Sequence, residues 1–124
     1  MLFSTFPQEP HALGLLMAEA MFTLEGCLGI SLGVQTPIPE IAAAARAHTA
    51  DILALSFSSM IPAPQALAGL NELRALVPET VEIWAGGACP GLRPKTGFLV
   101  LRELSAIALA VGDWRARAAV ARRA

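Results

Sequence analysis

Asp51-Ile52-Leu53-Ala54-Leu55-Ser56 carries the clearest fold signal in this chain of 124 residues. Four consecutive apolar residues between polar ends predict a strand that is buried on both faces, as in a parallel sheet covered by helices. Similar short apolar runs recur along the chain. We therefore predict strands at residues 2–6, 28–32, 51–56, 81–85 and 98–101.

Segments with helical spacing of apolar residues separate these strands, at 12–25, 38–48, 62–77 and in the remainder after residue 101. This alternation predicts an α/β fold with right-handed crossovers: a flavodoxin-like, doubly wound, parallel five-stranded sheet of order 2-1-3-4-5. We predict one domain spanning 1–124. Gly112-Asp113 should break the last helix, with Asp113 as a new N-cap and 113–124 as a C-terminal helix or tail.

The first predicted helix should pack on the sheet through a wide apolar stripe. The stripe comprises Leu13, Leu16, Met17, Ala20, Met21 and Leu24. The alanine-rich helix at 38–48 should face inward through Ile41 and Ala45.

The chain carries little charge. Charged residues make up 15% and hydrophobic residues 55%, against a usual charged share of about 25%. Such a surface predicts a covering partner, either a second copy or another domain. The net charge of −1 gives no electrostatic attraction to nucleic acid, and the arginines at 115, 117, 122 and 123 are interpreted as a solvated helix face or tail.

Cysteine usage and hydropathy indicate the cellular compartment in which the protein is expected. Cys27 and Cys89 are far apart and belong to no CxxC or Cys/His cluster, which predicts free thiols in a reducing cytoplasm. No apolar run reaches the roughly 18 residues of a membrane span. We therefore expect a cytoplasmic protein without a membrane partner.

Three polar or glycine-rich segments follow predicted strands that are neighbours in this order. They are Glu9-Pro10-His11-Ala12-Leu13-Gly14, Ser56 to Ser59, and Gly86-Gly87. Ligands of open α/β sheets bind at the carboxyl ends of the strands. An imidazole, a carboxylate to hold its second nitrogen, hydroxyls and glycines should therefore converge there. Taken alone, a histidine at this position is more often a helix-start residue near solvent than a metal ligand.

Together these residues resemble the cobalamin-binding domain with the Asp-x-His-x-x-Gly pattern, found in methionine synthases, corrinoid carriers, mutases and MerR-type regulators. The match comprises Glu9, His11, Gly14, Leu32-Gly33, Thr36-Pro37, Ser56, Ser58 and Gly86-Gly87. Glu at position 9 and the Leu-Gly-x-x-Thr-Pro segment look closest to the C-terminal domain of the cobalamin-dependent MerR-type transcriptional regulators.

The resemblance implies cobalamin as cofactor, in an adenosyl or methyl form that the residues do not distinguish. His11 would replace the cofactor's dimethylbenzimidazole as the lower axial cobalt ligand, with Glu9 orienting it and Ser56 bonding Glu9 next. Gly14, Ser58, Gly86 and Gly87 would make room for the nucleotide tail in a slot beside the strands. The family has a helix after the fourth strand that helps to wall this slot. Here residues 88–96 contain Pro90 and Pro94, so we expect that fourth helix to be shortened or absent.

We therefore expect a sensor or regulatory module rather than an enzyme. One alternative is a degenerate homologue that acts as an interaction or dimerisation domain without cofactor. Another is a phosphoryl-accepting receiver on the same fold, but that site needs clustered acidic residues. At the ends of the predicted strands the only acidic candidates are Glu9 and Asp51, and Asp51 lies at the start of its strand.

Overall fold

A computed structural model describes residues 1–93 and 97–123. The strands are β1 (Leu2–Ser4), β2 (Ile30–Ser31), β3 (Ile52–Phe57), β4 (Glu82–Gly87) and β5 (Leu99–Leu101). The helices are α1 (Leu13–Leu24), α2 (Ile38–Ala47), α3 (Ala63–Leu76) and α4 (Ala106–Arg123). The strands form one parallel sheet of order β2-β1-β3-β4-β5, which confirms the predicted flavodoxin-like fold.

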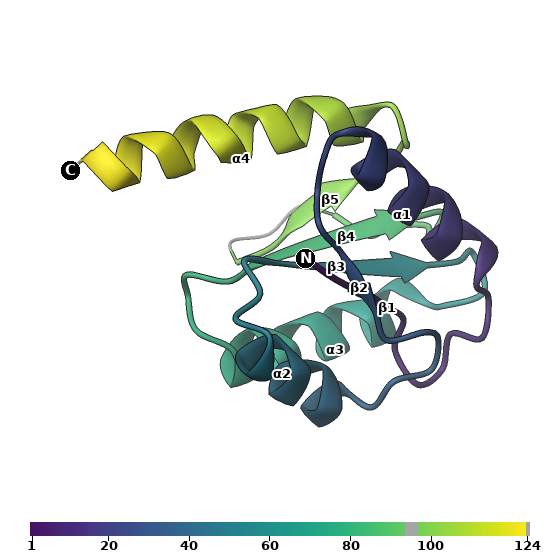
Figure 1. Ribbon diagram of the computed structural model, residues 1–124. Coiled ribbons are helices and arrows are strands. Elements are labelled where there is room, and N and C mark those ends of the chain that lie inside the picture. Colours follow the sequence, from purple (N-terminus) through teal and green to yellow (C-terminus); the bar gives the residue numbers. More distant parts are fainter. Residues whose placement is uncertain (94–96, 124) are drawn as a thin grey trace.

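The helices cover both faces of the sheet, with α2 and α3 on one side and α1 and α4 on the other (Figure 1). Alternate residues of β3 face the two layers. Leu53 and Leu55 pack under α2 and α3, whereas Ile52 and Ala54 pack under α1 and α4. The run that predicted a doubly covered strand is therefore buried on both sides.

Proline begins the helices of the first layer. Pro37 and Pro62 are the N-cap residues of α2 and α3, and each helix has a second proline in its first turn. Proline is tolerated there because the first N–H groups of a helix have no internal partner. The predicted inward residues of α2, Ile41 and Ala45, are both buried.

The segment between β4 and β5 contains no helix among its described residues, 88–93 and 97–98, as predicted. Pro94 lies outside the described residues. Within the described part of the chain, no helix has the length and apolar character to cross a membrane.

The predicted packing face of α1 is wrong. The helix contacts the sheet through Leu15 and Phe22, while most of the predicted stripe is exposed, including 78% of Leu24. Since α1 is apolar nearly all round, its own spacing does not select a face. The contacts of Phe22 with Phe3 and Trp84 do, at ring-centroid distances of 5.5 and 5.8 Å.

The predicted break at Gly112-Asp113 is also wrong, because α4 runs through it from Ala106 to Arg123. A glycine inside a helix costs only about 1 kcal/mol relative to alanine. Ile107 and Val111 anchor the helix before this glycine, and Arg117 forms an ion pair with Glu82 of β4 after it, at 2.8 Å. These contacts hold both halves of the helix against the sheet, so residues 113–123 continue α4 and do not form a separate element.

Candidate functional site

A buried carboxylate and an exposed imidazole meet on the loop between β1 and α1. Glu9 is only 1% exposed, whereas the side chain of His11 is 56% exposed, and Glu9 Oε1 lies 3.2 Å from His11 Nδ1. The backbone of Glu9 is fixed by its N–H to Phe6 O and by the Thr5 hydroxyl, which donates to Glu9 O at 2.7 Å. The loop thus holds one imidazole nitrogen against Glu9 and leaves Nε2 on the exposed side.

Ser58, and not Ser56, bonds the carboxylate of Glu9. The Ser58 hydroxyl donates to Glu9 Oε2 at 2.9 Å, and the Ser58 N–H donates to Oε1 at 3.2 Å. Sequence reasoning gave this contact to Ser56. However, β3 extends to Phe57, so Ser56 is still within the strand and faces the same α1 side of the sheet as Ala54. Ser58 follows the strand end, where the chain turns toward the loop of Glu9.

The segment after β2 is tied to the end of β1. Ser4 Oγ donates to Gly33 O at 3.0 Å and is hydrogen-bonded to the Thr36 hydroxyl at 2.8 Å. Gln35 N donates to Thr5 Oγ1 at 2.8 Å. Gly33 has a φ of +78°, a conformation that favours glycine. The segment that contains Leu32-Gly33 and Thr36 is therefore tied to the end of β1, just before the loop that carries Glu9 and His11.

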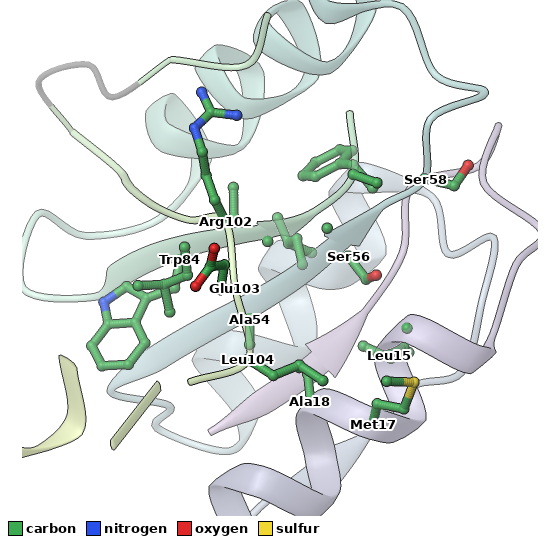
Figure 2. A pocket seen from close by; sticks show the side chains of 18 of the residues that line it. Leu15, Met17, Ala18, Ala54, Ser56, Ser58, Trp84, Arg102, Glu103 and Leu104 are labelled. Atoms are coloured by element: carbon green, nitrogen blue, oxygen red, sulfur yellow. The ribbon is translucent and has the colours of Figure 1, made fainter. Parts of the chain in front are cut away.

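A cavity of about 400 Å³ opens beside this loop, between the sheet and the α1/α4 layer. Its floor is made by β3 and β4, and α1, Leu104 and Ile107 form its sides. Figure 2 shows Leu15 and Ala18 of α1 across from Ala54 and Trp84 of the sheet. The lining is mostly apolar, with polar side chains from Glu9, His11, Ser56 and the segments that follow β3 and β5.

Three glycines of the predicted site lie where a side chain would not fit easily. A Cβ on Gly14 would lie 3.1 Å from Ser56 Oγ, and one on Gly86 would lie 3.3 Å from Leu101 O. Gly87 has a φ of +109°, and its Cβ would lie 2.0 Å from Phe57 O. Gly14 and Gly86 border the cavity, so their lack of a side chain keeps α1 and β5 close to its floor. All seven predicted site residues line this cavity.

The shortened segment after β4 does not form the wall of this cavity. Cys89, Leu92 and Phe98 belong to the core under α2 and α3, on the opposite face of the sheet, and only Ala88 of the described loop reaches the cavity. The described part of this segment therefore contributes little to this cavity. Its walls come from α1 and α4.

Sequence reasoning missed the groups that close the cavity, because they belong to elements far apart in the chain. Trp84 and Phe22 lie together at a centroid distance of 5.8 Å, and Leu104 and Ile107 come from the start of α4. Trp84 stands between Ile83 and Ala85 in an apolar strand. No local pattern distinguishes it from an ordinary core residue.

Two groups near the site have shifted pKa values. Burial raises the pKa of the Cys89 thiol, more than Arg102 lowers it, and this thiol donates to Ile61 O at 3.1 Å. Burial also favours the neutral form of Glu82, but hydrogen bonds from Arg117 and Trp84 outweigh it and lower the pKa of the carboxyl. Cys89 is thus a buried core thiol, whereas Glu82 joins Trp84 to Arg117.

Comparison with known proteins finds one family and several similar folds. The sequence model described as "B12 binding domain" matches residues 1–112, and no curated protein matches the chain. The monomethylamine corrinoid protein of Methanosarcina barkeri has a TM-score of 0.68 at 14% identity, covering 89% of this chain and 55% of that one. A cobalamin-binding protein from Desulfitobacterium hafniense DCB-2 has a TM-score of 0.61 at 18% identity, covering 70% and 43%. The chain spans about half the length of these structures, which share its fold.

Proposed function

The chain belongs to the B12-binding domain family, and on that premise we propose that it is a cobalamin-binding sensor or carrier module in which His11 ligates cobalt from the lower axial side. Its cofactor is cobalamin. One observation carries the proposal: an imidazole held by a buried carboxylate at the mouth of an apolar cavity.

The donor set fits this cofactor. Among the residues that the structure describes, no three His, Cys, Asp or Glu side chains gather into a metal site. A corrin ring brings four nitrogen ligands of its own, so the protein need supply only one axial donor. Imidazole suits a transition metal, and a carboxylate on its other nitrogen fixes the tautomer and raises its basicity. His11 would bind through Nε2, Glu9 would orient it, and Ser58 would hold Glu9.

The cavity supplies the second part of the site. If His11 held cobalt in place of the cofactor's own base, that base and its nucleotide tail would need a separate place, and the cavity that His11 lines would offer one. Gly14, Ser56, Gly86 and Gly87 border it, and the three glycines add no side chain to its lining. Bound cobalamin supplies the cobalt chemistry, while these residues position it and shield its tail from water.

We further propose that the module is regulatory, related to the MerR-type regulators, cytoplasmic, and not itself an enzyme. The Glu9 variant of the motif and the Leu32-Gly33 and Thr36-Pro37 segment support this branch. The exposed apolar stripe of α1 supports a partner, either a second copy or a covering helical domain.

Electron paramagnetic resonance of the cob(II)alamin complex tests the ligand. Protein labelled with ¹⁵N-histidine should change the axial nitrogen splitting from a triplet to a doublet, because ¹⁴N and ¹⁵N differ in nuclear spin. The doublet should vanish in His11→Ala and persist in His48→Ala, which removes the other histidine.

Two outcomes would contradict the proposal. A triplet in the labelled wild-type protein would show that the cofactor's own base still binds cobalt. A doublet that survives in His11→Ala but not in His48→Ala would show that His48, and not His11, binds cobalt. The degenerate-domain alternative predicts a slot filled by side chains, and the open cavity weighs against it.

A further inference from the structure

The cavity beneath the site changes in character with depth. Register pairs Ser56 with Gly86, and Ala54 with Trp84 two residues further back, which is roughly 7 Å along the strands. Over this floor α1 runs from Gly14 to Phe22, about 12 Å of helix. Phe22 and Trp84, in contact, therefore close the deep end, while Ser56 belongs to the upper part.

Every side chain at the deep end is apolar. The residues there are Ala18, Phe22, Ala54 and Trp84. The polar residues of the lining are Ser56 and residues that follow the carboxyl ends of β1, β3 and β5. The Arg102 guanidinium donates to Leu92 O, and the Glu103 carboxylate accepts from the Ser105 hydroxyl at 3.3 Å.

The one polar atom of the deep end is already bonded. Trp84 is 1% exposed, and its Nε1 donates to Glu82 Oε1 at 3.0 Å. Arg117 holds the same carboxylate at 2.8 Å. The indole thus presents only carbon to the cavity, and the backbone groups of Ala54 and Trp84 pair within the sheet. A ligand atom at this end finds no hydrogen-bond partner.

We infer that this apolar deep end makes the chain selective for a lower base with an apolar edge, preferring the dimethylbenzimidazole of cobalamin to the adenine of an adenine-based cobamide. The inference rests on the proposed function, which puts the tail in this cavity. Methyl groups of a benzimidazole would pack against Phe22 and Trp84. The amine and ring nitrogens of adenine would lose their water without gaining a partner, which is unfavourable.

Equilibrium binding of three corrinoids to the full chain tests the inference: cobalamin, the adenine cobamide and cobinamide, which lacks the nucleotide. We expect the adenine form to bind at least about tenfold more weakly than cobalamin. Ala54→Ser adds a hydroxyl at the deep end and should narrow that ratio at least about threefold. Ala110→Ser changes a buried alanine of the same layer that does not line the cavity, and should leave the ratio unchanged.

The outcomes separate this inference from the proposed function. If cobalamin binds no more tightly than cobinamide once the cost of releasing its own base from cobalt is subtracted, the tail does not use the cavity, and that part of the proposed function fails. If cobalamin binds more tightly than cobinamide but the adenine form matches it, the tail placement stands and the selectivity is overturned. Should Ala54→Ser fail to fold, Ala18→Ser on α1 puts a hydroxyl at the same end and decides the question.

Discussion

The contact between Ser58 and Glu9 is the smallest feature on which the site depends. Glu9 is almost fully buried, so its carboxylate needs partners to offset the loss of water. Ser58 supplies two of them, and His11 is the third. Groups that hold a ligating histidine from behind commonly change metal affinity by 10–100-fold.

Removing the Ser58 hydroxyl should therefore weaken the site without removing the ligand. We expect Ser58→Ala to lower cobalamin affinity about tenfold, while the histidine splitting in the resonance spectrum persists. Spectral titration measures the affinity. Ser105→Ala, which removes a hydroxyl bonded to Glu103, serves as the matched control. Unchanged affinity in Ser58→Ala would show that the backbone N–H and His11 suffice to hold Glu9.

Helix α4 is held at two points along its length, by apolar contacts near its start and by the Glu82–Arg117 ion pair further on. The same carboxylate fixes the Trp84 indole. This arrangement links the position of α4 to the deep end of the cavity. A long helix containing Gly112 stays continuous here because both of its halves have partners on the sheet.

The ion pair should make stability depend on pH. The pKa of Glu82 is lower in the folded chain than its ordinary value of 4.5, so its stabilisation is present above that value and is lost as the pH falls through the folded pKa. Since Arg117 is largely exposed, we expect a loss of less than about 1 kcal/mol. Urea unfolding at a series of pH values measures it. Glu82→Gln should lack this acid-side loss and Glu72→Gln, an exposed carboxyl of α3, should keep it; identical profiles would contradict the assignment.

The molecule as a whole buries one side of α1 and leaves an apolar stripe on the other. Leu13, Leu16, Met17 and Leu24 are exposed, and α1 lies at the outside of its layer (Figure 1). Exposed apolar surface of this kind usually marks an interaction site. It agrees with the low charge of the chain, which also favours a covering partner.

If a second copy covers this stripe, charges placed on it should separate the copies without unfolding them. We expect Leu16→Glu/Leu24→Glu to keep the wild-type melting temperature, since both side chains are exposed, and to lower self-association in sedimentation. Leu109→Glu on α4, also exposed, is the control. A wild-type chain that stays monomeric with and without cobalamin would contradict a homo-oligomer and favour a covering domain.

Local patterns were enough to predict the alternation of strands and helices and the pairing of Glu9 with His11, because these depend on neighbours a few residues apart. The sheet order followed from the fold class that this alternation favours. Tertiary contacts decided which serine bonds Glu9, which side of α1 is buried, and which elements wall the cavity. An apolar helix has no preferred face until Phe3 and Trp84 meet Phe22. Likewise, Trp84 becomes the end of a cavity only when α1 and α4, from opposite ends of the chain, pack above it.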